Sequence, residues 1–312
     1  MRIAVMGTGG TGGYFGGLLA RAGEEVTFIA RGAHLEAIRK NGLAVKSVLA
    51  GDFSISATAT DNPSDIGPVD FVLFCVKAYD NAAAAEQIRP LIGPETVVLS
   101  VQNGIDNEEQ IGKVIGPEHI LGCVSYVSST IESPGVIAQT GGPGKIVFGE
   151  MHGGMSARTE ALQSTLQNSG ITAELHSDIQ VALWQKFLGI CGVNGITALT
   201  RLPMGEIVAC KETHNLMRGT MQEVETVARA TGANLPEGCV DQSMDFFSSV
   251  EPSVRGSMYH DLAAGRRLEL EVLNGTVVRL GSEHGIPTPI NFAIYAALKP
   301  YLNGKPSSSA SS

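Results

Sequence analysis

The sequence predicts an α/β domain built on a doubly wound parallel sheet (residues 1–176), followed by an all-α domain (177–304). Three observations carry this prediction. Short apolar runs alternate with helical patterns up to about residue 175, and a glycine-rich turn directly follows the first run. From Ser177 or Asp178, a plausible N-cap, the apolar spacing changes to the 3.6-residue period of helices. The polar stretch at 305–312 is expected to be a disordered tail.

Five apolar runs of the first domain are predicted to be strands of the parallel sheet. They lie at 3–6, 26–30, 71–76, 96–101 and 119–127. The third and fourth, FVLFCV and TVVLSV, are apolar almost throughout, as strands covered on both faces are. Two further segments, 43–59 and 135–150, each predict a hairpin, the second one near the sheet edge.

The second domain is predicted to consist of helices alone. The helical patterns lie at 178–200, 205–231, 237–250, 254–264, 268–284 and 288–302. Gly232, Gly265 and Gly285 stand where helix C-caps are expected. No repeat of solenoid length is present in the sequence.

Composition and charge exclude several classes of protein. The 312 residues carry a net charge of -9, which argues against nucleic acid or an anionic membrane as a partner. No apolar run approaches the ~20 residues of a membrane span, and the N-terminus lacks the pattern of a signal peptide, so a cytoplasmic location is expected. The five cysteines form no CxxC and the seven histidines are scattered, so no metal site is expected.

The segment GTGGTG (7–12) fits the pattern GxGxxG. The six-residue pattern alone is weak, but here it follows a strand and opens a helix, which is the context that a dinucleotide-binding loop requires. Gly7 permits the tight turn, Gly9 allows backbone N–H groups to approach a pyrophosphate, and Gly12 lets the helix lie close to the strand. The alternative is a glycine-rich contact between helix and strand without a ligand.

Arg31 stands at the end of the second strand, where an NAD-binding protein usually carries Asp or Glu. A guanidinium offers a planar fork to a phosphate dianion and can stack on adenine. The sequence therefore predicts NADP(H) over NAD(H). A solvated arginine at a strand end is the alternative.

Polar residues also follow two later strands. Lys77 comes directly after one, and Gln102 and Asn103 come after the next. Ligands of open α/β sheets bind beyond the carboxyl ends of the strands, so Lys77 and Asn103 are candidates for contacts with cofactor or substrate. The ordinary alternatives are a surface lysine and an Asn-Gly turn.

One helix of the second domain, ALWQKFLGICGVNGITAL, is apolar on most sides yet contains Lys186 and Asn194. Positions 186, 190 and 194 share one side of this helix. A lysine that faces a cleft could donate a proton to the alkoxide formed from a ketone, whereas a lysine whose ammonium reaches solvent is the alternative.

Four polar residues further along are also candidates. Ser257 and Asp261 share a helix face, and Glu269 and Glu271 are expected to open the next helix. Carboxylates in a first turn are favoured by the helix dipole. Alternatively, one of the glutamates could hold the lysine charged and oriented.

Up to about residue 303 the chain resembles the ketopantoate reductase (2-dehydropantoate 2-reductase) family. The motifs that carry the resemblance are GTGGTG, IAR, CVKAYD, QNGIDNEE, LWQKFLGICGVNGITAL and GSMYHDLAAGRRLELEVLNG. The resemblance implies an N-terminal Rossmann domain that carries NADPH. It also implies that an all-α domain, related to that of 6-phosphogluconate dehydrogenase, closes over the cofactor.

The resemblance also implies roles for individual residues. Gly7, Thr8, Gly9, Gly10, Thr11 and Gly12 would hold the pyrophosphate, Arg31 the 2′-phosphate, and Lys77, Asn103, Ser128 and Glu269 would line the cofactor. Lys186 matches the general acid, and Glu269 matches the glutamate that orients it. Asn103, Asn194 and Ser257 match positions that bind substrate together with the lysine.

Three positions depart from the family pattern. Ile190 stands where the family often has a second asparagine, Gly256 where it usually has Ser or Asn, and Glu271 where it has Asp. Ile190 makes the expected site more apolar, so a branched or bulkier 2-oxo acid is an alternative to ketopantoate.

The expected function is NADPH-dependent reduction of a 2-oxo acid to the 2-hydroxy acid, with ketopantoate and pantothenate biosynthesis as the leading assignment. Two alternatives stay open: an NADP-dependent 3-hydroxy-acid or sugar-acid dehydrogenase on the same fold, and an NADPH-sensing protein without turnover. A homodimer is compatible with the sequence, although no distinctive interface stripe indicates one.

Overall fold

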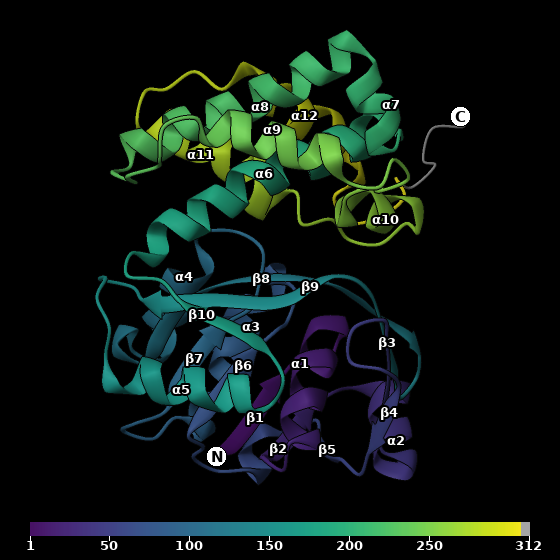
Figure 1. Ribbon diagram of the computed structural model, residues 1–312, viewed down its shortest axis with the longest axis vertical. Coiled ribbons are helices and arrows are strands. Elements are labelled where there is room, and N and C mark those ends of the chain that lie inside the picture. The colour runs from purple at the N-terminus through teal and green to yellow at the C-terminus, as the bar shows by residue number, and fades with distance from the viewer. Residues whose placement is uncertain (307–312) are drawn as a thin grey trace, which may run out of the picture. The chain divides into compact units, whose positions relative to one another are not determined.

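The computed structural model describes residues 1–306 and divides into two compact units (Figure 1). The first comprises Met1–Gln102 and Asp106–Ala182, and the second comprises Asn103–Ile105 and the chain from Leu183 onward. The first unit is α/β and the second is helical, so the predicted fold class is confirmed. Of the tail predicted to be disordered, residues 307–312 lie outside the described residues.

A parallel sheet forms the centre of the first unit. Its strands follow the order β5-β2-β1-β6-β7-β8, which is the order of doubly wound nucleotide-binding sheets. They are β1 (Arg2–Met6), β2 (Glu25–Ile29), β5 (Thr58–Thr60), β6 (Phe71–Phe74), β7 (Val97–Ser100) and β8 (Ile120–Ser133). The strand order reverses between β1 and β6, where such sheets bind their ligands. Every residue of β6 and β7 is buried, as the apolar runs predict.

A second group of strands extends this sheet. The long strand β9 (Val136–Glu150) runs antiparallel to β8, and its two ends pair with β3 (Leu43–Ser47) and β10 (Thr172–Leu175). β4 (Phe53–Ile55) pairs with β3 as the predicted hairpin requires. The rest of that segment forms β5 on the opposite edge of the sheet, so the prediction of one strand over 53–59 is wrong.

The prediction of a hairpin within 135–150 is also wrong, because these residues form the single strand β9. The glycines of TGGPG resemble a turn, and Gly142 and Gly144 do have positive φ angles of 74° and 61°. β8, however, continues to pair with β9 on both sides of this segment, with register shifts around Ser128. The glycines therefore form an irregularity within a strand and do not reverse the chain.

Helix α1 (Gly10–Arg21) uses its glycines to approach strands on two sides. A Cβ at Gly16 would lie 2.7 Å from a methyl group of Val5 and 2.8 Å from the Phe28 ring, in strands of the parallel sheet. A Cβ at Gly13 would meet Ile137 of β9 at 2.6 Å. Larger side chains would push the helix away, so these glycines fix the depth at which α1 sits.

Four more helices belong to this unit: α2 (Gly32–Asn41), α3 (Asn81–Gln87), α4 (Asn107–Ile115) and α5 (Ala157–Asn168). The sequence analysis assigned no structure to α5 and β10. A signal for α5 was present, because Ser156 and Thr159 form a capping box at its start.

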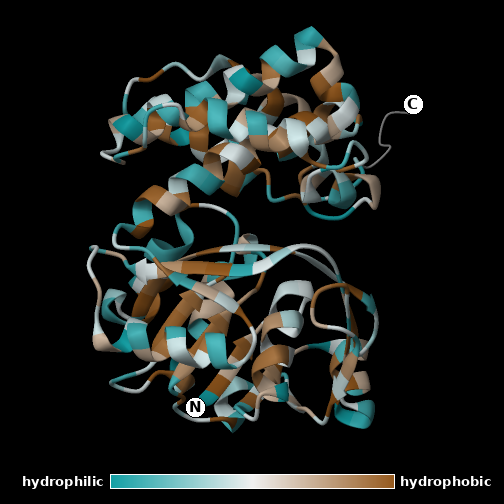
Figure 2. Ribbon diagram, in the orientation of Figure 1, coloured by the Kyte–Doolittle hydropathy of each residue, from teal (hydrophilic) through white to brown (hydrophobic). Residues whose placement is uncertain are grey.

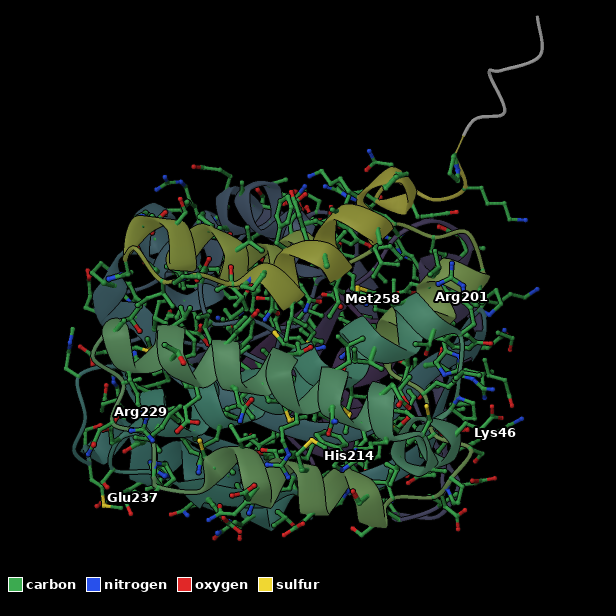
Figure 3. The ribbon with its side chains drawn as sticks, turned by 90° about the horizontal axis from the view of Figure 1, so that it is seen from above. Lys46, Arg201, His214, Arg229, Glu237 and Met258 are labelled. Carbon is green, nitrogen blue, oxygen red and sulfur yellow. The ribbon has the colours of Figure 1, made fainter. Side chains whose placement is uncertain are left out.

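The helical unit is built around α6 (Ile179–Thr200), most of which belongs to it. The other helices are α7 (Met204–Ala209), α8 (Lys211–Ala230), α9 (Cys239–Ser249), α10 (Ser257–Ala263), α11 (Thr276–Glu283) and α12 (Pro289–Leu298). Most of α6 carries apolar residues that pack in the core of this unit, and Figure 2 shows brown segments along the helix. It ends at Thr200. The next residue, Arg201, labelled in Figure 3, has a φ of 66°. Its guanidinium lies 5.9 Å from the centre of the Tyr301 ring.

Helix boundaries in this unit differ from the predictions at two places. The segment 205–231 is two helices, with extended backbone at Cys210 between them. The segment 268–284 begins with residues that form no helix or strand, followed by a π-helical turn, η5 (Glu271–Gly275), before α11. The predicted C-cap glycines Gly232, Gly265 and Gly285 all have positive φ angles, which confirms them.

Two further findings concern the whole described chain. No described helix is long and apolar enough to cross a membrane. No disulfide joins the five cysteines, all of which lie within the described residues.

Candidate active site

The glycine loop between β1 and α1 is enclosed on two sides and open on the third. Gly7 has a φ of 95°, and a Cβ there would lie 2.9 Å from the backbone nitrogen of Val76. A Cβ at Gly10 would lie 2.2 Å from the carbonyl oxygen of Ser129. A Cβ at Gly9, in contrast, would meet nothing within 4 Å. The loop is therefore pressed between the β6 end and β8, and open space lies above Gly9.

The donors that face this open space are backbone N–H groups. Gly9 is the N-cap of α1, no side chain caps the helix, and no acidic residue lies in its first turn. The N–H groups of Gly10, Thr11 and Gly12 are thus the uncapped donors of a helix N-terminus, which favours an anion. Together with the open space at Gly9, this donor set fits the pyrophosphate of a dinucleotide.

Thr8 and Gly12 fix the glycine loop against the rest of the α/β unit. Thr8 is buried, and both its backbone N–H and its hydroxyl donate to the carbonyl of Ile29 at 3.1 and 3.0 Å, so its side chain faces the protein. A Cβ at Gly12 would lie 2.3 Å from the Gly7 carbonyl oxygen and 3.1 Å from the Cys75 side chain. Burial raises the pKa of the Cys75 thiol. The thiol is therefore uncharged and packs against the loop, and it does not act as a nucleophile.

Arg31 is the extended N-cap residue of α2, two positions beyond β2. Its side chain is 82% exposed, and one guanidinium nitrogen (Nη2) lies 3.8 Å from the carboxylate oxygen Oδ2 of Asp80. Exposed ion pairs at this distance are weak, so the Arg31 guanidinium can still bind a phosphate. The negative charge of Asp80 would repel that phosphate. The sequence analysis assigned no role to Asp80, although it follows Lys77 by three residues in CVKAYD.

His34 lies in the first turn of α2 and is partly buried. Its Nδ1 accepts a hydrogen bond from the backbone N–H of Gly135 at 3.0 Å, which leaves the proton on Nε2. Burial lowers the pKa of His34 below its usual value. A neutral His34 thus links α2 to the β8–β9 turn.

Lys77 and Asn103 occupy equivalent positions beyond two neighbouring strands. Phe74 of β6 pairs in register with Ser100 of β7, and each of the two polar residues lies three positions further along its own chain segment. Both are half-buried. The topology therefore supports the prediction that both follow the carboxyl edge of the sheet.

Ser128 lies in β8, immediately before the residue that the glycine loop contacts. It is exposed, its hydroxyl lies 3.4 Å from that of Thr140, and the strand register shifts on both sides of it. A bulge of this kind turns backbone groups away from the ladder. Ser128 is thus brought beside the loop by the same β8 segment that contacts Gly10.

In the helical unit, Lys186, Ile190 and Asn194 share one side of α6, as their spacing predicts. Lys186 and Ile190 are half-buried, whereas Asn194 is 5% exposed. The apolar residue between the two polar ones packs partly against the core of this unit.

Asn194 binds the start of α10. Its Oδ1 accepts hydrogen bonds from the backbone N–H of Met258 at 2.9 Å and from the hydroxyl of Ser257 at 3.2 Å, while its Nδ2 donates to the Ile190 carbonyl at 3.0 Å. Asn194 thus replaces the side-chain cap that Gly256, the N-cap residue, lacks. Sequence spacing gave no sign of this structural role.

We call Asn194, Thr197, Gly256, Ser257 and Met258 the α6–α10 junction. A Cβ at Gly256 would lie 2.6 Å from Oδ1 of Asn194, and the Gly256 N–H donates to the Thr197 hydroxyl at 3.1 Å. Met258, labelled in Figure 3, is 1% exposed and anchors the junction in the core. Ser257 is exposed, and the hydrogen bond to Asn194 orients its hydroxyl.

The two glutamates of ELE differ sharply. Glu269 is 6% exposed and lies outside any helix or strand, between the buried residues Leu268 and Leu270, so the prediction that it opens a helix is wrong. Glu271 begins the π-helical turn and binds Lys299 and the hydroxyl of Tyr295 at the surface. Glu271 therefore forms a surface ion pair, whereas the carboxylate of Glu269 is buried.

Asp261, which is predicted to share a face of α10 with Ser257, forms an ion pair with Arg266. Its Oδ1 accepts a hydrogen bond from Nε of Arg266 at 2.8 Å, which closes the end of α10. Within the described residues no group of three or more His, Cys, Asp or Glu side chains could hold a metal ion.

Comparison with known proteins matches both units. The family model of ketopantoate reductase PanE/ApbA matches residues 3–153, and the model of its C-terminal part matches residues 178–302. The chain is 32% identical to 2-dehydropantoate 2-reductase of Mesorhizobium japonicum over 96% of this chain and 97% of that one.

Solved structures of this family also match the chain over nearly its whole length. The ketopantoate reductase of Ralstonia eutropha JMP134 is 34% identical, with a TM-score of 0.89 over 96% of this chain and 98% of that one. The ternary structure of D-mandelate dehydrogenase with NADH and anilino(oxo)acetate has a TM-score of 0.88, with 96% of this chain and 98% of that chain covered, but at 24% identity it shows the fold alone. Relatives above 30% identity over nearly the whole length, and family models for both units, place the chain in the ketopantoate reductase family of oxidoreductases.

Proposed function

We propose that the protein reduces 2-dehydropantoate, or a related 2-oxo acid, to the 2-hydroxy acid with NADPH. The observation that carries the proposal is that Lys186 and Asn194 lie on the same side of α6. Asn194 in turn orients the hydroxyl of the exposed Ser257. A proton donor and an oriented hydroxyl are the groups that reduction of a carbonyl requires.

In the proposed mechanism, the reduced nicotinamide, when bound, supplies a hydride to the carbonyl carbon. Lys186 donates the proton that the carbonyl oxygen acquires, and Glu269 holds the lysine oriented. Asn103 and Ser257 bind oxygens of the substrate, and Asn194 binds them with its remaining Nδ2 hydrogen while it fixes Ser257. With the hydride on its carbon and the proton from Lys186 on its oxygen, the carbonyl would become the hydroxyl of the 2-hydroxy acid.

For the cofactor, the proposal assigns the pyrophosphate to the loop from Gly7 to Gly12, and the 2′-phosphate to Arg31. Lys77, Asn103 and Ser128 line the remainder. The open space over Gly9 and the exposed guanidinium support this assignment. Because D-mandelate dehydrogenase, which has the same fold, was solved with NADH, each binding experiment should use both NADPH and NADH.

The substrate is proposed to carry an apolar substituent on the 2-oxo acid. Ile190 lies one turn from Lys186 and one turn from Asn194, and it offers no hydrogen bond to the hydroxyl of ketopantoate. Branched 2-oxo acids without that hydroxyl should therefore be reduced with kcat/KM at least equal to that for ketopantoate. Ile190→Asn should shift the ratio towards ketopantoate by about 10-fold, the effect of one hydrogen bond, whereas Ile190→Leu should not.

The test is NADPH consumption at fixed enzyme with ketopantoate and with smaller, branched and aromatic 2-oxo acids. Turnover of at least one such acid is expected, without oxidation of 3-hydroxy acids or sugar acids by NADP⁺. Saturable NADPH binding without turnover of any 2-oxo acid would instead favour the sensing protein. Oxidation of 3-hydroxy acids would favour the dehydrogenase.

A further inference from the structure

A chain of buried amides joins the two loops that follow β6 and β7. The Ser100 hydroxyl donates to Oε1 of Gln102 at 3.0 Å. The Gln102 amide nitrogen donates both its hydrogens, to the Val76 carbonyl and to Oδ1 of Asn81, each at 2.7 Å. Ser100, Gln102 and Asn81 are 1%, 7% and 2% exposed, so water does not replace these bonds easily.

The chain continues into α4 in the same direction. The Asn81 amide nitrogen donates to Oδ1 of Asn107 at 2.9 Å and to Oε1 of Gln110 at 3.3 Å. If the Gln102 amide were reversed, its oxygen would face two acceptors, the Val76 carbonyl and Oδ1 of Asn81. The network therefore fixes one orientation of Gln102, and each bond depends on the next.

The hydrogen bonds of Gln102 involve groups adjacent in the chain to Lys77 and Asn103, two residues of the proposed site. The Val76 carbonyl is the group directly before Lys77, and Gln102 itself directly precedes Asn103. One side chain thus sets the backbone at both positions. β6 and β7 already pair along their length, so this link adds a connection between the loops beyond the one that the sheet provides.

We propose that Gln102 is a positioning residue that holds Lys77 and Asn103 in register for cofactor and substrate. The inference rests on the proposed function in so far as these two residues form the site. Gln102 acts through its neighbours and touches neither reactant. Asn81 supports it as the acceptor that keeps the amide in place.

The variant Gln102→Glu tests this with almost no change in shape. Glutamate retains an acceptor for Ser100 but cannot donate to the Val76 carbonyl or to Asn81, so both loops lose their link. Gln102→Met, which has similar length and no hydrogen-bonding amide, is the second variant and serves if the glutamate variant is insoluble.

The chain offers a matched control in Gln139 of β9. It is 1% exposed, accepts hydrogen bonds from Ser47 and Leu49, and donates one to the Gly141 carbonyl at 2.8 Å. Gln139→Glu removes the same kind of donor from an equally buried amide. Its hydrogen-bond partners Ser47, Leu49 and Gly141 are not proposed to contact cofactor or substrate, although Gly141 pairs with Ser128 in the ladder, so this variant separates the link to Lys77 and Asn103 from a general loss of a buried donor.

Melting temperature, NADPH and NADH affinity, and kcat and KM per folded enzyme are measured for all variants. Both glutamate variants should melt at lower temperature. Gln102→Glu and Gln102→Met should also lose about 10- to 100-fold in kcat/KM for the 2-oxo acid, as expected for misplaced reactants, and should bind both cofactors more weakly. Gln139→Glu should retain wild-type kinetics and affinity.

If the Gln102 variants keep wild-type kcat, KM and affinity while they lose stability to the same extent as Gln139→Glu, the positioning role is overturned. Absence of turnover in the wild-type protein would defeat the proposed function instead. In that case cofactor affinity alone still decides the inference, because weaker binding by the Gln102 variants but not by Gln139→Glu would support it.

Discussion

The glycine loop of the α/β unit and the α6–α10 junction of the helical unit present their polar groups by opposite means. In the loop, the donors are backbone N–H groups, and the absence of side chains makes the space that a ligand needs. At the junction, the polar groups are the side chains of Asn194 and Ser257, which hold one another. Only one glycine, Gly256, is needed there, to let the two helices meet.

This difference separates two kinds of substitution. Added atoms or lost charges beside the loop should weaken cofactor binding, because that region provides a surface for phosphates. Removal of a side chain on α6 or α10 should reduce turnover while the cofactor still binds, because that region provides reacting and orienting groups. The following predictions test this separation, starting with the largest expected effect.

Lys186→Ala should reduce kcat by about 100-fold or more, because it removes the proposed general acid, while NADPH affinity stays near the wild-type value. Steady-state kinetics and a fluorescence titration with NADPH measure the two quantities. Lys299→Ala, which removes a lysine of the same unit from a surface ion pair, is the control. Equal turnover of the two variants would contradict the assignment.

Arg31→Ala should weaken NADPH binding by about 30-fold, the loss of charged hydrogen bonds to a phosphate, and should leave NADH binding unchanged. Arg39→Ala is the matched control, since Arg39 also lies on the surface of α2 and pairs with Glu36. Titration of each variant with both cofactors decides the matter. A parallel loss of NADPH and NADH affinity would show that Arg31 does not read the 2′-phosphate.

Glu269→Gln should lower kcat by about 10-fold, because it removes the charge proposed to orient Lys186, and Glu271→Gln should have little effect. The two positions lie two residues apart, but one is buried and the other pairs with Lys299 at the surface. Kinetics of the two variants side by side make the comparison. A larger loss in Glu271→Gln would transfer the role to the surface carboxylate.

Asp80→Asn should strengthen NADPH binding by about threefold at low ionic strength, because it removes a charge that opposes the 2′-phosphate near Arg31. The gain should shrink as salt is added, since both groups are exposed. NADH affinity should not change. Titrations at two salt concentrations measure this effect, and a weaker affinity for NADPH would show that Asp80 supports Arg31 instead.

Local patterns predicted much of this molecule. The apolar runs of β6 and β7, the glycine loop and the C-cap glycines Gly232, Gly265 and Gly285 are each specified by residues close in sequence. The spacing of Lys186 and Asn194 likewise places them on one side of α6, because a helix has a fixed period.

Features that depend on distant partners could not be predicted in this way. Asn194 caps a helix that begins 63 residues later, and Gln102 finds its acceptors 26 and 21 residues earlier in the chain. Gly142 and Gly144 remain within one strand because β8 pairs with β9 on both sides of them. In each case the decisive contact forms only when the tertiary structure brings the partners together.

The measurement that most directly tests the central claim follows the hydride. Wild-type enzyme is given a 2-oxo acid and NADPH that carries deuterium at C4, in separate 4R and 4S forms, and the product is examined by mass spectrometry and NMR. The account predicts one deuterium at C2 of the 2-hydroxy acid from one of the two forms, with one product molecule formed for each NADPH oxidised. No 2-hydroxy acid, or a C2 hydrogen that comes from solvent, would contradict it.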